Sequence, residues 1–266
     1  MDPVISIRDV TVSYGGHCVL NNINLEVQRG EVMVLLGGSG AGKSTLLRQI
    51  IGLEGPSQGT VYIQGVDINR CSKKELKMIR HTMGVAFQEA ALFPSLSTKE
   101  NVAMPLLELT ALADPVIEIM SYLKLAAVGL GESGALLPEE LSGGMKMRAA
   151  IARATALDPE ILVLDEPSAG LDPIVAAELD ELLLFLKRLF HMTIVVVTHE
   201  MASAFRIADR VAFLCHGSLI AVESKDLFQE SKDPRIRQFV DRVPDEITES
   251  ATVQRHLREL AGITGA

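Results

Sequence analysis

The chain has 266 residues, 48% of them hydrophobic, and its formal net charge is −9 at pH 7. This length and apolar content can fill the core of one large domain or two small ones, which excludes a disordered or fibrous protein. The acidic balance argues against broad nucleic-acid binding, so we expect no nucleic-acid partner, although a local basic patch would be compatible with the composition.

Neither the cysteines nor the N-terminal residues point to the cell exterior. The three cysteines, Cys18, Cys71 and Cys215, form no Cys-x-x-Cys or Cys/His cluster. They therefore indicate neither a disulfide framework nor a zinc site, and a reducing cytosol fits best. The first ten residues lack the basic start and apolar core of a signal peptide, and the apolar runs are much shorter than the roughly 20 residues that span a bilayer. We expect a cytoplasmic protein, with any membrane role supplied through a partner.

The N-terminal part of the sequence predicts strands and one helix. Clusters of β-branched and apolar residues at 4–12 and 18–27 predict an antiparallel hairpin. Val32–Leu36 is a short apolar run that ends in glycines, the pattern of a buried strand feeding a loop. A helix is predicted from Lys43 until the glycines of residues 52–59 break it.

The middle of the chain, from about residue 95 to 155, has a helical pattern. Ser97 and Glu100 have the spacing of a capping box, and residues 106–130 are mostly helix formers. We expect a helical subdomain inserted into an α/β core.

Two apolar strands follow, Ile161–Leu164 and Thr193–Val197, separated by a long helix around residues 176–190. Strand, helix and strand in this order predict parallel pairing with a right-handed crossover. The predicted fold class is therefore α/β, with a mixed-sheet core, an antiparallel β-subdomain and the inserted helical subdomain, all within residues 1–225.

Residues 226–266 are predicted to form a helical tail. Asp233 precedes a proline at a predicted first helical position, and Val253, Leu257 and Leu260 fall on one helical face. A short amphipathic helix needs a packing surface, which is either its own domain or a second subunit.

A glycine-rich loop lies between the first buried strand and the first helix. Gly37–Ser44, read GGSGAGKS, satisfies G-x-x-x-x-G-K-[ST] in the strand-to-helix context that this motif requires. Glycines let the N–H groups turn toward phosphate oxygens, the Lys43 ammonium reaches the terminal phosphates, and the Ser44 hydroxyl is a ligand for Mg²⁺. An ordinary glycine-rich turn is the less favoured alternative. The predicted phosphate-binding residues are Gly37, Gly38, Ser39, Gly40, Ala41, Gly42, Lys43, Ser44 and Thr45.

Acidic residues after a later strand supply the other half of such a site. In Ile161–Glu166, Asp165 would hold the Mg²⁺ shell and Glu166 would polarise the attacking water as general base. Acidic pairs after strands are also common in loops, so this assignment depends on the glycine-rich loop. His199 closes the strand Thr193–Thr198, where α/β folds place ligands, and a γ-phosphate contact is favoured over a structural role.

Ser142, Gly143 and Gly144 form a second anion-binding segment. Ser142 can cap the following helix, the glycines leave N–H groups unobstructed, and the helix dipole favours an anion. One nucleotide rarely needs two such devices from one subunit. An economical arrangement is a head-to-tail dimer in which this segment covers the γ-phosphate bound by the partner. An ordinary capped turn would be favoured if the segment stood alone.

Together these motifs resemble the ATP-binding subunits of ABC transporters, from about Val4 to Glu223. The resemblance implies an ABC ATPase fold of the P-loop NTPase class, which hydrolyses ATP with Mg²⁺ in a nucleotide-sandwich dimer of two copies. It makes Leu141–Met145 the signature motif and Ser168–Asp172 the D-loop, whose Asp172 joins the nucleotide site.

The resemblance assigns two further residues. Tyr14 would stack on adenine, and Gln88 would sense Mg²⁺ and water while linking the core to the helical subdomain. From the residues alone, Tyr14 could equally be a strand aromatic and Gln88 a surface amide.

A narrower resemblance is to the MlaF-type ATPases of MCE-protein lipid transporters. It is based on Met145, where the family usually has glutamine, and on the segments Phe87–Glu108, Gly170–Ile174 and Asp233–Phe239. It implies phospholipid transport between bacterial inner and outer membranes with a MlaE-type permease, a MlaD-type MCE protein and often a MlaB-type STAS-domain protein. The subunit would lie peripherally at the cytoplasmic side of the inner membrane, with apolar residues 90–96 in the permease docking groove. A buried hydrophobic loop is the competing interpretation of that segment.

Two other functions stay open at this point. An ABC importer for a small polar solute shares every catalytic motif, so only its permease distinguishes it. A soluble ABC ATPase of DNA repair or translation is less favoured, because such proteins usually carry long coiled-coil insertions or tandem cassettes.

Overall fold

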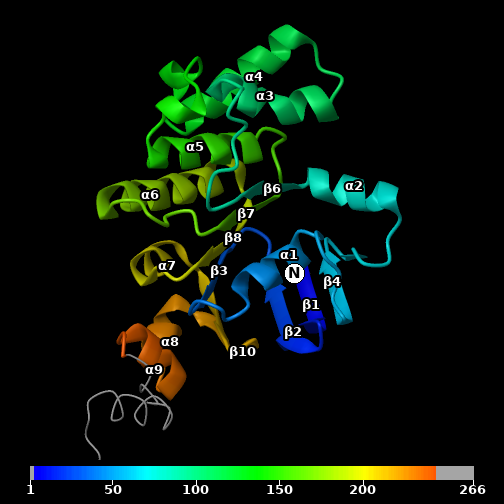
Figure 1. The fold of residues 1–266 in the computed structure, drawn as a ribbon, viewed down its shortest axis with the longest axis vertical. Helices are drawn as coiled ribbons and strands as arrows, with labels where there is room; N and C mark the ends of the chain where they lie inside the picture. The colour runs from blue at the N-terminus through cyan, green and yellow to red at the C-terminus, as the bar shows by residue number, and fades with distance from the viewer. Residues whose placement is uncertain (1–2, 244–266) are drawn as a thin grey trace, which may run out of the picture. The chain divides into compact units, whose positions relative to one another are not determined.

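The computed structural model describes residues 3–243. The chain divides into two compact units between Glu230 and Ser231. Figure 1 shows the two sheets and the helices of the first unit. Among residues 3–243, none of the helices combines the length and apolar character of a bilayer-spanning segment.

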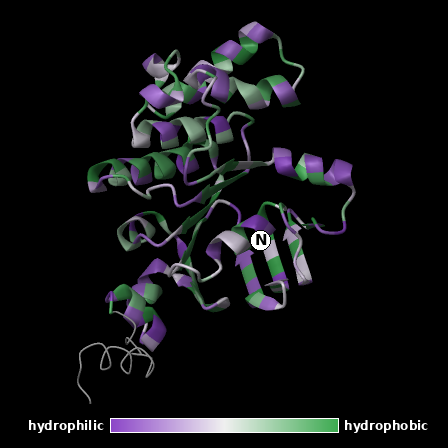
Figure 2. Cartoon of the chain, in the orientation of Figure 1, coloured by the Kyte–Doolittle hydropathy of each residue, from purple (hydrophilic) through white to green (hydrophobic). Residues whose placement is uncertain are grey.

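The first sheet is antiparallel, with strand order β2-β1-β4-β5. Its strands are β1 (Ile5–Tyr14), β2 (His17–Val27), β4 (Gln58–Ile63) and β5 (Val66–Asp67). Strands β1 and β2 pair from Ile5 opposite Val27 to Tyr14 opposite His17, which confirms the predicted hairpin. Hydrophilic and hydrophobic residues alternate along these strands (Figure 2), because successive side chains point to opposite faces.

The second sheet has the order β10-β9-β3-β8-β7-β6. Its strands are β3 (Val32–Gly37), β6 (Met83–Ala86), β7 (Ile161–Asp165), β8 (Thr193–Thr198), β9 (Arg210–Cys215) and β10 (Ser218–Ser224). All neighbouring pairs are parallel except β9 and β10. The predicted parallel pairing of the strands around residues 161 and 193 is confirmed, and so is the mixed-sheet α/β class.

This topology creates the edge at which several of the predicted site residues lie. Strands β3, β8 and β7 are neighbours, and Leu36 pairs with Thr198 while Asp165 pairs with Val197. Because carboxyl ends of parallel strands meet at one edge of a sheet, the loops that follow these three strands start side by side.

Helices flank the second sheet, and two of them were not predicted. They are α1 (Lys43–Ile50), α2 (Lys73–His81), α6 (Pro173–Phe190), α7 (Met201–Ile207) and α8 (Lys225–Gln229). The sequence analysis predicted neither α7 nor α2, although Ser72 and Glu75 form a capping box for α2. Strands β6, β9 and β10 were not predicted either, and β6 is short and contains Gly84. A Cβ at Gly84 would lie 2.2 Å from the carbonyl oxygen of Ala154, so this glycine lets the end of a helix approach the strand closely.

The helical subdomain forms where the sequence predicted it. It contains α3 (Thr98–Leu109), α4 (Asp114–Ala127) and α5 (Gly143–Ala154), with 3₁₀ turns at Gly131–Ser133 and Pro138–Glu140. Ser97 and Glu100 make both hydrogen bonds of the predicted capping box. The helical stretch from residue 106 is interrupted at 110–113, where α3 ends and α4 has not begun.

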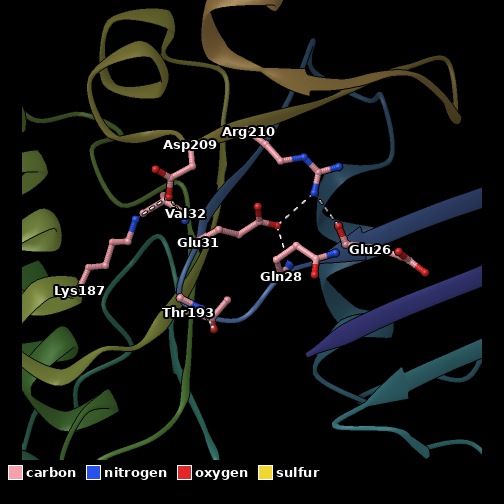
Figure 3. A network of polar contacts seen from close by, with 9 residues as sticks. Glu26, Gln28, Glu31, Val32, Lys187, Thr193, Asp209 and Arg210 are labelled. Atoms are coloured by element: carbon pink, nitrogen blue, oxygen red, sulfur yellow. Dashed lines mark hydrogen bonds and ion pairs between the residues drawn. The ribbon is translucent and has the colours of Figure 1, made fainter. Parts of the chain in front are cut away.

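A polar network joins the two sheets at the amino end of the parallel strands (Figure 3). The Glu31 carboxylate accepts hydrogen bonds from the Gln28 N–H (2.7 Å) and from Arg210 (3.3 Å). Arg210, at the start of β9, also donates to the carbonyl of Glu26 on β2 (3.2 Å). Burial raises the pKa of Glu31, and the nearby Asp209 carboxylate adds to this, while the Gln28 N–H and Arg210 oppose it.

The second unit, described as far as residue 243, contains α9 (Pro234–Val240). The Asp233 carboxylate caps it by accepting the Arg235 N–H (2.9 Å), which confirms the predicted helix start. Hydrogen bonds from the Arg235 side chain lower the pKa of Asp233 to about 2. The predicted apolar face of Val253, Leu257 and Leu260 lies outside the described residues.

Candidate functional site

The glycine-rich loop owes its shape to three of its glycines. Gly40 and Gly42 have φ angles of 74° and 102°, which other residues rarely adopt. A Cβ at Gly37 would lie 2.3 Å from the carbonyl oxygen of Leu214, and one at Gly42 would lie 2.7 Å from a Leu20 methyl group. The loop can therefore wind tightly onto the start of α1, which leaves backbone N–H groups at that end available for an anion.

Lys43 is buried inside this loop. Its ammonium donates to the carbonyls of Gly37 (2.9 Å) and Gly38 (3.0 Å), and it lies 3.8 Å from Glu166 Oε1. Burial lowers the pKa of Lys43, while the carboxylates of Glu166 and Asp165 act in the opposite direction. The lysine thus connects the loop to the acids at the end of β7.

Asp165 provides the strongest indication of a cation site. Its Oδ1 atom is buried and has no hydrogen-bond partner within the described part of the chain. Burial, and then the neighbouring Glu166, raises the pKa of Asp165. A buried carboxylate oxygen without a partner is costly, and a hard cation is the ligand that would satisfy it. The Ser44 hydroxyl, exposed at the start of α1, is compatible with the same cation.

Glu166 is held by both neighbouring strands. It follows β7 with a φ of 48°, and its N–H donates to the carbonyl of Val197 on β8 (2.8 Å). His199 follows β8, and its Nδ1 atom lies 2.9 Å from Glu166 Oε2, which also accepts the His199 N–H (3.3 Å). The structure therefore brings Lys43, Glu166 and His199 together, as their motifs suggested. The His199 imidazole contacts the Glu166 carboxylate in this structure. The predicted contact of His199 with a γ-phosphate stays a prediction.

The helix α5 begins at the segment that the sequence analysis predicted to bind a second anion. Ser142 caps it through the Met145 N–H (3.3 Å), as predicted, and Ser142 and Gly143 are exposed. A Cβ at Gly144 would lie 2.5 Å from a Val175 methyl group on α6. Gly144 thus has a packing reason that the sequence did not reveal. Met145 is partly buried.

Gln88 lies in the loop after β6 and lines a cavity that is not lined by the glycine-rich loop. The cavity has a volume of about 210 Å³, and Gly143, Met147 and Ala169–Leu171 are among the other residues that line it. The structure thus places Gln88 beside the start of α5 and the D-loop. Its predicted role toward Mg²⁺ and water stays a prediction.

Tyr14 and Asp172 complete the predicted set. The Tyr14 side chain is 45% exposed and its hydroxyl donates to Glu54, which raises the pKa of the tyrosine. The Asp172 carboxylate caps α6 by accepting the N–H groups of Ile174 (3.0 Å) and Val175 (3.1 Å). Neither contact tests the proposed roles, because both roles need a bound nucleotide.

The sequence reasoning missed two residues that hold the loop after Gln88. Arg153 on α5 donates to the carbonyls of Ala90 and Ala91, and Asn101 on α3 bonds to the backbone around Phe93. The only signal for Asn101 was a polar residue within an apolar helix face, and the sequence carried none for Arg153.

A family model described as ABC transporter matches residues 20–169, which include the glycine-rich loop, the start of α5 and the acids after β7. The chain belongs to the ABC transporter family. It is 40% identical to the intermembrane phospholipid transport system ATP-binding protein MlaF of Escherichia coli K12, over 91% of this chain and 90% of that protein. The predicted MlaF-type ABC subunit is thereby confirmed as a resemblance.

A second curated relative and a solved structure are also similar to this chain. The probable ribonucleotide transport ATP-binding protein mkl of Mycobacterium leprae is also 40% identical, over 90% of this chain and 69% of that protein. A solved structure of a dimeric ATP-binding cassette in a post-hydrolysis state, bound to ADP and Pi, has 33% identity and a TM-score of 0.76. It covers 83% of this chain and 98% of its own. The predicted ABC ATPase fold is confirmed.

Proposed function

We propose that this ABC subunit hydrolyses ATP in a head-to-tail dimer and that hydrolysis drives phospholipid transport. The observation that carries the catalytic part is the position of Glu166, held between the Lys43 ammonium and the His199 imidazole at the carboxyl edge of the sheet. That edge is where α/β folds bind their ligands.

The proposed reaction begins with a water beside Glu166. The carboxylate takes one proton from the water, whose oxygen forms a bond to the γ-phosphorus of ATP. The bond between that phosphorus and the β,γ-bridging oxygen breaks, and ADP leaves with the electron pair, so the products are ADP and inorganic phosphate. The left-handed backbone at Glu166 and its N–H bond to Val197 fix where the carboxylate points.

The residues that would bind the substrate lie on the same edge. The amides of Gly37–Thr45, which lead into and begin α1, would bind the phosphates together with Lys43. Asp165, Ser44 and Gln88 would hold Mg²⁺, which supplies charge neutralisation on the phosphates when bound. The buried, unpartnered Oδ1 of Asp165 supports this assignment.

The dimer accounts for the exposed start of α5. Ser142 and Gly143 are exposed, and Gly143 lies beside Gln88 and the D-loop. In a head-to-tail pair, this end of α5 would face the γ-phosphate bound by the partner copy, and His199 and Asp172 would join the composite site. A related cassette with 33% identity is described as dimeric with ADP and Pi bound, which supports the same arrangement here.

The transported substrate is proposed from the relatives. MlaF of Escherichia coli is named as a phospholipid transport subunit and matches nine-tenths of both chains. By that likeness, this chain would work with a MlaE-type permease, a MlaD-type MCE protein and a MlaB-type STAS-domain protein at the cytoplasmic side of the inner membrane. The Phe93 side chain in the segment 90–96 is 43% exposed, which suits permease docking better than a buried loop.

A second candidate is the ATPase of an importer for a small polar solute. It is favoured by mkl, named as a probable ribonucleotide transport subunit and equally identical to this chain. The catalytic residues are the same for both candidates, so only the membrane partner separates them.

The deciding experiment is purification of the intact complex from native membranes, with mass spectrometry of the associated proteins and lipids. We expect a permease, an MCE protein and phospholipid in amounts that follow the complex. A permease accompanied by a soluble solute-binding protein, with no MCE protein, would establish the importer instead.

A further inference from the structure

The loop that carries Gln88 has an unusual backbone. Ala90 and Ala91 follow one another with φ angles of 61° and 48°. Residues other than glycine rarely adopt this left-handed region, and a conformation of this kind persists only when its surroundings enforce it. The Ala90 N–H donates to the carbonyl of Phe87 (2.8 Å), which closes a tight turn around Gln88.

Arg153, in the last turn of α5, enforces this turn. Its Nη1 donates to the Ala91 carbonyl (2.8 Å) and its Nη2 to the Ala90 carbonyl (2.9 Å), while the guanidinium carbon lies 5.9 Å from the centre of the Phe93 ring. Burial lowers the pKa of Arg153, yet an arginine stays charged near neutral pH, so both hydrogen bonds are charge-assisted. The planar fork matches two consecutive carbonyls, which a lysine ammonium cannot reproduce.

A second residue fixes the following part of the loop. Asn101 on α3 is fully buried, and its Oδ1 accepts the Phe93 N–H (2.8 Å). Its Nδ2 donates to the carbonyls of Phe93 (3.1 Å), Leu96 (3.0 Å) and Ser97 (3.1 Å). Asn101 therefore holds the loop where it enters α3, whereas Arg153 holds the residues next to Gln88.

Arg153 lies on the same helix that begins directly after Ser142, so its contacts join the Gln88 loop to that helix. The helix α5 starts at Gly143, directly after Ser142, and Arg153 is its penultimate residue. A hydrogen-bonded helix of this length moves as a rigid rod of about 18 Å. One end of α5 therefore follows Ser142 and lies near Gln88, and the other end holds the Ala90 and Ala91 backbone of the same loop.

We propose that Arg153 is a positioning residue that sets Gln88 for catalysis and makes the Gln88 loop move together with α5. The proposal rests on the proposed ATP hydrolysis, because it gives Gln88 a task at the nucleotide. Arg153 itself touches neither nucleotide nor metal in this account. It acts only through the backbone of Ala90 and Ala91.

The first test compares Arg153→Ala and Arg153→Lys with the parent protein in the assembled transporter. We expect nucleotide affinity within about threefold of the parent, while kcat falls about 10- to 100-fold in Arg153→Ala, the scale expected when a catalytic group is misplaced by about 1 Å. Arg153→Lys should recover part of that loss, because one ammonium can still bond to one carbonyl. If Arg153→Ala does not fold, the comparison of Arg153→Lys with the parent protein is the test.

Arg148→Lys is the matched control. Arg148 lies on the same helix and also donates to a loop carbonyl, that of Val128 (3.2 Å), and it pairs with Glu178 (2.9 Å). We expect its kcat within about twofold of the parent, because additivity holds for sites with no shared partners. An equal loss of kcat in Arg148→Lys and Arg153→Lys would overturn the proposal, since the effect would then belong to the helix as a whole.

A double-mutant cycle identifies the residue through which Arg153 acts. If Arg153 works by placing Gln88, then Gln88→Ala/Arg153→Ala should be within about twofold of Gln88→Ala alone. If the fold-losses of kcat in the two single variants multiply in the double variant, the two residues act independently and the proposal is overturned. A Gln88→Ala variant with full kcat would overturn it as well, and a slow Gln88→Ala beside a normal Arg153→Ala would do so while leaving the proposed hydrolysis intact.

A last measurement does not depend on activity. Amide hydrogen exchange in residues 87–93 of nucleotide-free Arg153→Lys should rise by about tenfold or more, whereas exchange in β7 and β8 stays unchanged. Unchanged protection in residues 87–93 would overturn the proposal even in a protein that hydrolyses ATP. A parent without ATPase activity would contradict the proposed function, and the exchange result would then still decide whether Arg153 holds the loop.

Discussion

The glycine-rich loop and the start of α5 are both suited to bind an anion, yet they differ in what faces them. Within one chain, Lys43 of the loop faces Glu166 at 3.8 Å, and Glu166 faces His199 at 2.9 Å. The exposed Gly143 at the start of α5 instead faces a cavity lined by Gln88 and the D-loop. The proposed catalytic groups that face the first region therefore come from its own sheet.

This difference supports a division of labour between two copies. Neighbouring parallel strands deliver the loop, the acids and His199 to one edge, so that half of the site forms when the chain folds. The segment at Ser142 lies on an inserted subdomain and is joined to the core through helix packing, as at Gly144 and Val175. It would become catalytic only when a partner presents a nucleotide.

The largest expected effect is at Glu166. Glu166→Gln keeps the shape of the side chain but removes the base, so we expect hydrolysis to fall about 10²- to 10⁴-fold with nucleotide affinity retained. Steady-state phosphate release and equilibrium binding of ATP measure the two parts, and size-exclusion chromatography with ATP should show an accumulated dimer. Near-normal turnover would rule out Glu166 as the base.

The next largest effects should differ between the two regions, because one variant affects hydrolysis and the other affects ATP binding. Ser142→Arg should leave ATP binding to its own loop within a few-fold and lower hydrolysis about 10²- to 10³-fold, the scale of a lost oxyanion donor. Lys43→Ala should instead weaken binding itself, by about tenfold or more, because a charge-assisted bond to phosphate is lost.

Mixing these two impaired variants, at an ATP concentration too low to saturate Lys43→Ala, tests the contribution of the partner directly. One composite site in each mixed dimer would combine an intact loop from Ser142→Arg with an intact Ser142 from Lys43→Ala. We expect ATPase activity to return on mixing. Failure to regain activity, although mixed dimers form, would contradict the head-to-tail arrangement.

A smaller effect should appear in stability when the start of α5 is changed. Gly144→Ala places a methyl group 2.5 Å from Val175, and we expect overpacking to lower the free energy of unfolding by about 1 to 3 kcal/mol. Gly143→Ala is the matched control, because its methyl group would lie 3.3 Å from Leu171, a distance that a small shift relieves. Urea unfolding of both variants checks this. Equal stabilities would show that Gly144 is not required by packing.

The smallest effect concerns the network at the amino end of the sheet, far from the catalytic edge. Because burial raises the pKa of folded Glu31, its proton is held more tightly in the folded than in the unfolded state. The parent should therefore lose stability relative to Glu31→Gln as pH rises from the ordinary glutamate value of about 4.3 toward the raised one. Thermal unfolding across this range measures the difference, and an opposite slope would mean that the Arg210 pair outweighs burial.

Much of the local structure of the proposed catalytic half could be predicted because short, local patterns encode it. The sequence Gly37–Ser44 specifies a strand-to-helix loop by residue type alone, and Ile161–Glu166 specifies a buried strand that ends in acids. Parallel pairing then brings the two together. The contact between His199 and Glu166, 33 residues apart, could be expected only as proximity, and its geometry depends on strand register.

The remaining features depend on contacts between distant elements. The helix α2 and strand β6 were missed because one is strongly polar and the other is four residues long. The packing role of Gly144 depends on where α6 crosses α5, and the hold of Arg153 on Ala90 depends on a loop 63 residues away. Side-chain type and spacing along the sequence do not indicate which distant elements come into contact.

The sequence by itself determined the local parts of the proposed site: a glycine-rich loop between a strand and a helix, acids at the end of a buried strand and a capped glycine segment, each set by backbone conformation and residue type within a few neighbouring positions. Only the tertiary structure decided how these parts are connected. It placed Lys43, Glu166 and His199 in contact and left the start of α5 exposed beside Gln88, because strand order and helix packing, not local pattern, fix which distant residues meet.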